Sequence, residues 1–182
     1  TFARFIIVLG FLRTGLGTQG APPNQVLVGT ALFMTLFVMA PTIEQVRQQA
    51  VSPYLSGQLT ESQAAEAATP PIRAFLLGHT REDDLALFYE VARAERPTSA
   101  ADVPLRMAIP AFVLSELRTA FEMGLTLLLP FLVIDLLVAI VLTSLGMMMM
   151  PPVVVAMPLK LLVFVAVGGW HLVVESLLRG AM

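Results

Sequence analysis

The sequence predicts an all-α protein of integral-membrane type, with two repeated helical hairpins and an inserted polar helical domain. Hydrophobic residues make up 57% of the 182 positions and charged residues only 13%, whereas soluble domains carry about 25% charged residues. Three long stretches are nearly free of charge, and no segment shows a convincing two-residue period of a strand. The charges gather instead in one central segment, which predicts a polar insert between the hydrophobic parts.

The first hydrophobic hairpin is expected in residues 1–43. Residues 5–12 are apolar and lie between two arginines. We expect them to be the end of a longer helix that is truncated at its N-terminus, because the chain begins with Thr1 rather than methionine. Residues 24–43 then carry no charge. At about 1.5 Å per helical residue, this stretch is long enough to cross a hydrocarbon core of about 30 Å.

A polar, mostly helical extracytoplasmic insert is expected in residues 44–104. The wider segment 44–122 contains eleven of the thirteen acidic residues. Two pairs inside the insert have the spacing of a helix N-cap and the residue that reciprocates it three positions later. These pairs are Thr60 with Gln63 and Thr80 with Asp83, and they predict helices over about 61–68 and 81–94, separated by Thr69-Pro70-Pro71.

The second hydrophobic hairpin is expected in residues 123–182, after an amphipathic helix over 105–122 whose apolar side chains recur near one face. The first arm of this hairpin ends at Pro151 and contains one charged residue, Asp135. The 23 residues that follow contain only Lys160. Each arm is therefore long and apolar enough to cross a membrane as a helix.

The turns of the two hairpins are related in sequence, since position 14 aligns with position 143. "TGLGTQGAPP" (14–23) and "TSLGMMMMPP" (143–152) share the threonine, the Leu-Gly pair and the Pro-Pro pair. Leu-Gly is expected to end one helix and Pro-Pro to start the next. Because both hairpins run the same way, their tips should lie on one side of the assembly and the polar insert on the other.

The second turn carries four methionines in place of the polar and small residues of the first turn. Methionine is a common gap-filler, so one interpretation is a turn buried in lipid or protein. The other is the constriction of a pore, where flexible apolar side chains from several copies exclude ions by dewetting. The methionines are Met147, Met148, Met149 and Met150, and the residues expected to shape the loop are Gly146, Pro151 and Pro152.

Several long segments together resemble the FliP family, the P subunit of the flagellar type III protein export gate. They include "RFIIVLGFLRTGLGT", "IRAFLLGHTREDDLALF", "RMAIPAFVLSELRTAFEMG", "LPFLVIDLL" and "LGMMMMPP", and the resemblance runs over essentially the whole chain. The related subunit of virulence injectisomes shares "PPN", "SEL", "VIDL" and the methionine run. The "HTREDDLALF" stretch is closer to the flagellar branch, which we therefore prefer.

The resemblance implies a function that composition does not. Members of the family assemble in several copies, as a homopentamer, with the Q and R subunits and beside the A and B export components. Their channel conducts unfolded flagellar proteins and is closed by the methionine loop, which acts as a gasket. The implied location is the bacterial inner membrane in the flagellar basal body, with the core raised above the membrane plane. Two positions depart from the family pattern: Met150 replaces a valine and Gly168 an aspartate.

Two isolated charges in the apolar arms are expected to pair. A charge near the centre of a bilayer costs about 2.5 to 3.5 kcal/mol on insertion scales. Asp135 and Lys160 lie at similar distances from the turn, so we expect an ion pair within one subunit or between neighbours. Glu116 is the rival partner of Lys160, and Arg118 belongs to the same set of candidate charges. A structural ion pair is the favoured interpretation over a proton relay.

Nothing in the sequence predicts an enzyme, a metal or a cofactor. His171 and Glu175 are four residues apart, and two ligands are too few for a stable metal site. The acids of "TREDD" suit the first turn of a helix, and no phosphate-binding loop or nucleophile arrangement is evident. No basic patch suggests nucleic acid. The alternative functions are a small-molecule transporter, whose repeated hairpins would enclose a midplane site, and a purely structural assembly protein.

Overall fold

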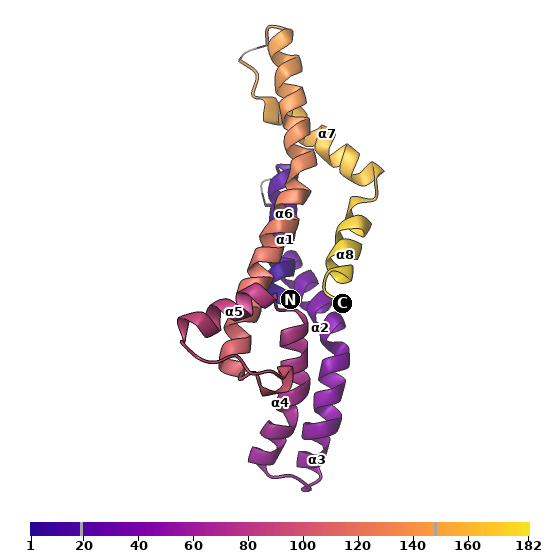
Figure 1. The fold of residues 1–182 in the computed structure, drawn as a ribbon. Coiled ribbons are helices and arrows are strands. Elements are labelled where there is room, and N and C mark those ends of the chain that lie inside the picture. The colour runs from indigo at the N-terminus through magenta and orange to yellow at the C-terminus, as the bar shows by residue number, and fades with distance from the viewer. Residues whose placement is uncertain (19, 148) are drawn as a thin grey trace. The chain divides into compact units, whose positions relative to one another are not determined.

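The computed structural model describes residues 1–18, 20–147 and 149–182, and these residues form helices without a strand (Figure 1). The all-α prediction is confirmed. In chain order the elements are α1 (Phe2–Leu16), α2 (Asn24–Val46), the π-helix η1 (Arg47–Val51), α3 (Ser52–Leu55), α4 (Glu61–Gly78), α5 (Glu82–Val91), the 3-10 turn η2 (Ala100–Asp102), α6 (Leu105–Ser144), α7 (Pro152–Ala166) and α8 (Gly169–Arg179).

The chain forms two compact units. The first contains Thr1–Thr35 and Thr119–Met182, and the second contains Leu36–Arg118. Both divisions fall inside helices, within α2 and α6. Each unit is therefore described by itself. The first holds both hairpin turns, including the methionines of the second turn, and the second holds the polar insert.

The two hairpin turns of the first unit begin in the same way. Gly17 follows α1 with φ of 72°, and Gly146 follows α6 with φ of 75°. This left-handed conformation is readily adopted by glycine and commonly ends helices. Pro152 is the first residue of α7, as the Pro-Pro pattern predicts. The matching prolines of the first turn directly precede α2, which starts at Asn24.

The third apolar stretch differs from the prediction of one straight helix. It forms α7 and α8, which are bent by 66° at the break between them. The bend begins at Gly168, whose φ of 67° is left-handed. Among the residues that the structure describes, two helical segments are long and apolar enough to cross a membrane, Asn24–Leu55 and Leu105–Ser144, or three if the bent pair forms one span.

The corner between α7 and α8 is packed against an aromatic ring. A Cβ atom on Gly169 would lie 2.2 Å from Cδ2 of Phe164, far inside normal contact. Trp170 packs edge-on against the same ring, with ring centroids 5.5 Å apart. The corner is therefore specified by glycine at two positions, first for the backbone angle and then for space.

We expect Gly169→Ala to destabilise the first unit by about 1–3 kcal/mol, the usual cost of forcing extra volume into a packed site. Trp170 is the sole tryptophan, so the fluorescence change on thermal unfolding reports on this corner. Gly10→Ala is the matched control, because a Cβ atom there meets nothing within 4 Å. If both variants unfold at the same temperature, the ring does not fix the corner.

Helix α1 is anchored in the first unit by its N-terminal end and by one apolar face. Phe5, Leu9 and Leu12 are almost completely buried. The buried guanidinium of Arg4 donates a hydrogen bond to the carbonyl oxygen of Gly180, directly after α8. Cations are favourable near the C-terminal end of a helix. Arg4 therefore ties the start of the chain to the end of α8.

In the second unit, the capping prediction at Thr60 and Gln63 is confirmed. The predicted end of the helix that starts there is wrong. The Thr60 N–H donates to Oε1 of Gln63 at 2.9 Å, and the Gln63 N–H donates to Oγ1 of Thr60 at 3.4 Å. The helix that begins there does not stop at residue 68. α4 continues through Pro70 and Pro71 to Gly78. Proline normally weakens a helix interior, but tertiary context overrides this preference here, since Pro71 is buried.

The second capping prediction, at Thr80 and Asp83, is wrong. Helix α5 begins at Glu82 with Arg81 as its N-cap residue. The Thr80 hydroxyl instead donates to the carbonyl oxygen of Leu76 at 2.7 Å, so it satisfies a carbonyl group in the last turn of α4. Threonine often bonds a carbonyl four residues back, and this local alternative takes the hydroxyl away from the next helix. Helix α5 also ends earlier than predicted, at Val91.

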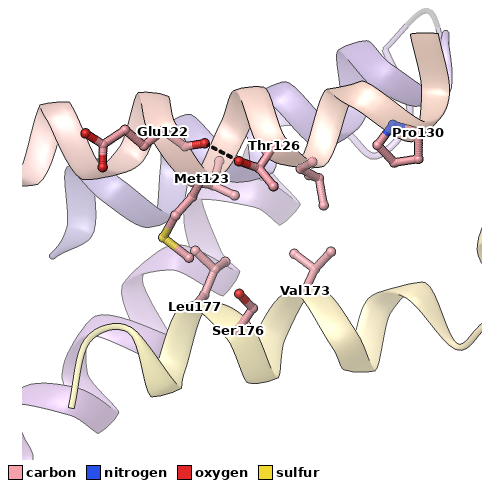
Figure 2. A pocket seen from close by; sticks show the side chains of 9 residues that line it. Glu122, Met123, Thr126, Pro130, Val173, Ser176 and Leu177 are labelled. Carbon is pink, nitrogen blue, oxygen red and sulfur yellow. Dashed lines mark hydrogen bonds between the residues drawn. The ribbon is translucent and has the colours of Figure 1, made fainter. Parts of the chain in front are cut away.

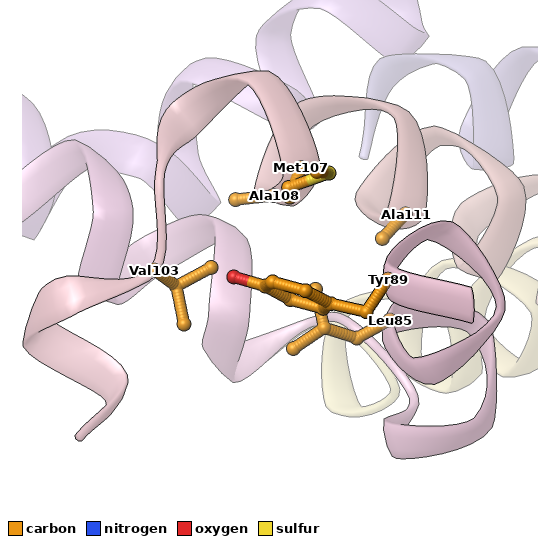
Figure 3. Packing of buried hydrophobic residues seen from close by; sticks show 6 residues of the cluster. All are labelled: Leu85, Tyr89, Val103, Met107, Ala108 and Ala111. Atoms are coloured by element: carbon orange, nitrogen blue, oxygen red, sulfur yellow. The ribbon is translucent and has the colours of Figure 1, made fainter. Parts of the chain in front are cut away.

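The core of the second unit joins α5 to the start of α6 (Figure 3). The aromatic ring of Tyr89 lies between the two helices, and small alanine side chains on α6 leave room for it. The buried cluster consists of Leu85, Tyr89, Val103, Met107, Ala108 and Ala111. Its apolar contacts hold the first turns of α6, which continues as one helix into the apolar arm.

Candidate functional site

The second hairpin turn, called here the methionine turn, exposes the methionine side chains that the structure describes in it. Met149 is 98% exposed, and Met147 and Met150 are each 39% exposed. Met148 lies outside the described residues. Backbone hydrogen bonds order the described part of the turn. They run from the Gly146 N–H to Thr143 O at 3.0 Å, from the Met147 N–H to Leu142 O at 3.0 Å and from the Met150 N–H to Met147 O at 3.2 Å. The loop is thus a closed turn that carries flexible thioether side chains at its outer surface.

The first hairpin turn also reverses the chain direction, and polar side chains stabilise it. Oγ1 of Thr18 donates to the Ala21 carbonyl oxygen, and Nη1 of Arg13 donates to Oδ1 of Asn24 across the turn. These bonds satisfy polar groups within the turn itself. A solvated turn of this kind needs no methionine. Because the first turn reverses the chain without methionine, the exposed methionines of the second turn are not needed for chain reversal.

The structure brings Asp135 and Lys160 together behind the methionine turn. Nζ of Lys160, on α7, donates to Oδ2 of Asp135, on α6, at 2.6 Å. The Lys160 side chain is only 5% exposed and the Asp135 side chain 40%. A buried cluster of Val138, Leu142 and Ala156 packs the same two helices nearer the turn. The pair therefore ties the two arms of the second hairpin to each other.

The other two predicted charges, Glu116 and Arg118, lie in the second unit. Arg118 Nη1 lies 3.6 Å from Oδ1 of Asp84. Glu116 is almost completely buried in α6. The structure thus gives Lys160 a partner in the first unit and gives Arg118 a different acid from those that the sequence suggested.

Sequence reasoning missed a buried polar cluster around Asp84. The Ser115 hydroxyl donates to Oδ2 of Asp84 at 2.6 Å, and the Arg81 N–H donates to Oγ of Ser115 at 2.9 Å. Asp84 and Ser115 are both buried. A signal was present, because Asp84 precedes Phe88 by four residues and so shares the helix face that packs on the core. The cluster fastens the start of α5 to α6.

Two side chains of α8 contact the same carboxylate, that of Glu175, at the helix surface. Arg179 Nη2 lies 2.7 Å from Oε1 of Glu175, and His171 Nε2 lies 3.7 Å from Oε2 of the same carboxylate. Residues four apart meet on one helix face. Within the described ranges, no group of three or more histidine, cysteine or acidic side chains is placed to hold a metal ion.

An open groove of about 440 Å³ lies beside α6 and α8 (Figure 2). Thr126 turns its hydroxyl to the Glu122 carbonyl oxygen at 2.8 Å, so this polar group is already satisfied within α6. The rest of the lining is largely apolar. It consists of Val8, Glu122, Met123, Thr126, Leu127, Pro130, Val173, Ser176 and Leu177. The groove offers an apolar surface with few polar groups to orient a small molecule.

Comparison with known proteins places this arrangement in a family. The sequence model of the FliP family matches residues 1–177. The flagellar biosynthetic protein FliP of Bacillus subtilis is 49% identical over 178 residues, covering 98% of this chain and 80% of that protein. The protein of the same name from Caulobacter vibrioides is 50% identical over 185 residues, covering 100% of this chain and 70% of that protein.

A third relative agrees with these two. The flagellar biosynthetic protein FliP of Pectobacterium carotovorum is 50% identical over 177 residues, covering 97% of this chain and 69% of that protein. The family match extends over both compact units, both hairpin turns and the paired charges of α6 and α7. The resemblance that the sequence motifs suggested is therefore confirmed, and the chain belongs to the FliP family.

Proposed function

We propose that this chain is a pore-forming core subunit of the flagellar type III protein export gate, in which the methionine turn seals a channel for unfolded proteins. The observation that carries the proposal is the outward position of Met147, Met149 and Met150 at a turn that needs no methionine to reverse the chain. The names of the relatives support the flagellar assignment, since each is called a flagellar biosynthetic protein.

The seal requires several copies of the second hairpin around one axis. A thioether side chain has three rotatable bonds and packs against irregular surfaces. A ring of such chains fills the channel when it is empty and adapts to a passing polypeptide. A narrow apolar ring also excludes water and ions by dewetting. The Lys160–Asp135 pair supports this role, because it holds the two arms that carry the turn.

The partners and location follow from the same proposal. A pentamer of this chain would combine with the Q and R subunits, with the A and B components beside it. The long apolar helices suit the bacterial inner membrane at the flagellar basal body. In a core raised above the membrane plane, the exposed apolar faces of α2 and α6 would contact other subunits as well as lipid.

Deletion of Met147–Met149 tests the seal. We expect the purified complex to remain assembled while its ion conductance in planar bilayers rises severalfold, because the apolar constriction is removed. A variant with serine at the same three positions keeps the loop length and should leak as well. Met182→Ser, at an exposed methionine outside the turn, is the matched control. Unchanged conductance in both turn variants would favour a purely structural subunit.

A further inference from the structure

We propose that the corner between α7 and α8 is a hinge, and that the two helices join into one membrane-spanning helix where lipid surrounds the free chain. The bent form that the structure describes is then the form in which water or a neighbouring subunit covers the corner. Helices α7 and α8 are bent by 66° and have the length and apolarity of a span only when they are taken together. The hinge does not depend on the methionine seal, because it lies at the other end of α7.

Helix α7 alone is too short to cross a bilayer. Its 15 residues extend about 22 Å at about 1.5 Å per residue, whereas the hydrocarbon core is about 30 Å thick. The apolar sequence continues beyond α7, since residues 161–174 contain no lysine, arginine or acidic residue. Joined as one helix over residues 152–179, the two segments extend about 42 Å. The sequence thus supplies a full span that the bend divides.

The bend places the ends of two helices inside this apolar segment. Each helix end leaves backbone N–H or C=O groups without a partner in the helix. Hydrogen bonds close part of the corner, from the Gly168 N–H to Val165 O at 3.1 Å and from the His171 N–H to Gly168 O at 2.9 Å. Val165 and Val167 are 72% and 56% exposed, so the chain does not cover the corner itself. Because irregular backbone exposed to lipid is not stable in the hydrocarbon region, lipid around the free chain favours the straight helix.

Side-chain contacts at the far end of α8 favour the bent form. Leu177 is fully buried, and Arg4 donates a hydrogen bond to the carbonyl oxygen of Gly180. An open groove of about 440 Å³ lies between α8 and α6 (Figure 2), so these two helices pack incompletely against each other. Helix α7 has its own attachment to α6, the ion pair of Lys160 with Asp135. Helix α8 can therefore detach while the second hairpin stays paired.

The first measurement uses the free chain in lipid nanodiscs. The chain contains no cysteine, so spin labels attach only at introduced cysteines. Phe2→Cys and Arg179→Cys label the start of α1 and the end of α8, which lie together in the bent form through Arg4 and Gly180. Straightening moves the end of α8 by about 18 Å, given its 11 residues and the angle of 66°. We expect electron paramagnetic resonance to show this separation in nanodiscs.

A second pair of labels distinguishes straightening from simple release of α8. Val154→Cys and Arg179→Cys lie on the two sides of the corner, at exposed side chains. The distance between them grows by about 6 Å when the bend straightens, and does not change if α8 detaches while the corner stays bent. In the assembled complex we expect the shorter distance. The hinge is refuted if this distance is the same in nanodiscs and in the complex.

Gly168→Ala tests the glycine of the corner. Alanine is disfavoured at the left-handed backbone angle of Gly168 and favoured inside a helix, so the ratio of straight to bent chain should rise about tenfold. Fewer free chains are then competent to assemble, and the apparent Kd for assembly should rise by about the same factor. Gly57→Ala is the matched control, because Gly57 also has a left-handed φ, of 74°, and open space around it, but lies in the second unit. Equal assembly of the two variants would contradict a hinge at Gly168.

The outcomes separate the hinge from the proposed function. The label distances report the hinge whether or not deletion of Met147–Met149 causes an ion leak. A leak in the deletion variant without straightening in nanodiscs would leave the seal standing and refute the hinge. Straightening without a leak would refute the seal and leave the hinge standing.

Discussion

Lys160→Met is expected to lower the free energy of unfolding of the first unit by about 3 kcal/mol, near the lower end of the cost of breaking a buried ion pair. Methionine keeps the length of the lysine side chain but leaves the Asp135 carboxylate without its partner at 2.6 Å. The lower end applies because the Asp135 side chain is 40% exposed and water can solvate part of its charge. Denaturant unfolding of the purified protein in detergent measures the change.

The matched control is Arg179→Met. Arg179 and Glu175 also form an ion pair, at 2.7 Å, but the Arg179 side chain is 80% exposed. Exposed pairs contribute about 0–1 kcal/mol, so this variant should unfold close to the wild type. A similar loss in both variants would mean that burial of Lys160 does not set the strength of its pair.

A second substitution separates charge from packing. Replacing a buried ion pair by apolar residues of similar volume is often neutral or stabilising. Lys160→Met combined with Asp135→Leu should therefore regain most of the lost stability. Assembly on native gels should follow the same order, because α6 and α7 carry the turn to the proposed channel. A double variant as unstable as Lys160→Met alone would assign the loss to packing.

Sequence periodicity and turn chemistry predicted most helices, because their signals are local. The capping pair at Thr60 and Gln63, and the glycines at 17 and 146, each act within one turn. The Lys160–Asp135 pair was predictable for a different reason, since each charge is isolated in apolar sequence and lies at a similar distance from the turn. In apolar sequence, few side chains of opposite charge are available to pair with an isolated charge.

Most of the errors arose where a packing contact that residue patterns do not reveal decides a local structure. Pro70 and Pro71 carry a helix-ending signal, but Pro71 is buried and the helix continues through it. The corner at Gly169 depends on the ring of Phe164, and no pattern of hydrophobicity reveals that contact. Asp84 was interpreted as one of several acids at a helix start, whereas burial beside Ser115 distinguishes it from its neighbours.

Asp84→Ala is expected to destabilise the second unit by about 2–3 kcal/mol, the cost typical of losing hydrogen bonds to a buried charged group. The variant removes the acceptor of the Ser115 hydroxyl and the acid near Arg118. It also frees the start of α5 from α6, so we expect faster amide hydrogen exchange in α5. Chemical unfolding and hydrogen exchange measure the two effects.

Glu82→Ala is the control on the same helix. Glu82 pairs with Arg96 at the surface, where both side chains are exposed, so its loss should cost about 0–1 kcal/mol. Ser115→Ala completes a double-mutant cycle with Asp84→Ala, and residues in contact should show a coupling energy of about 0.5–3 kcal/mol. Additive losses would show that the two side chains act independently. A clear coupling would show that the start of α5 is fastened to α6 by this hydrogen bond, and that the apolar cluster around Tyr89 does not hold the two helices alone.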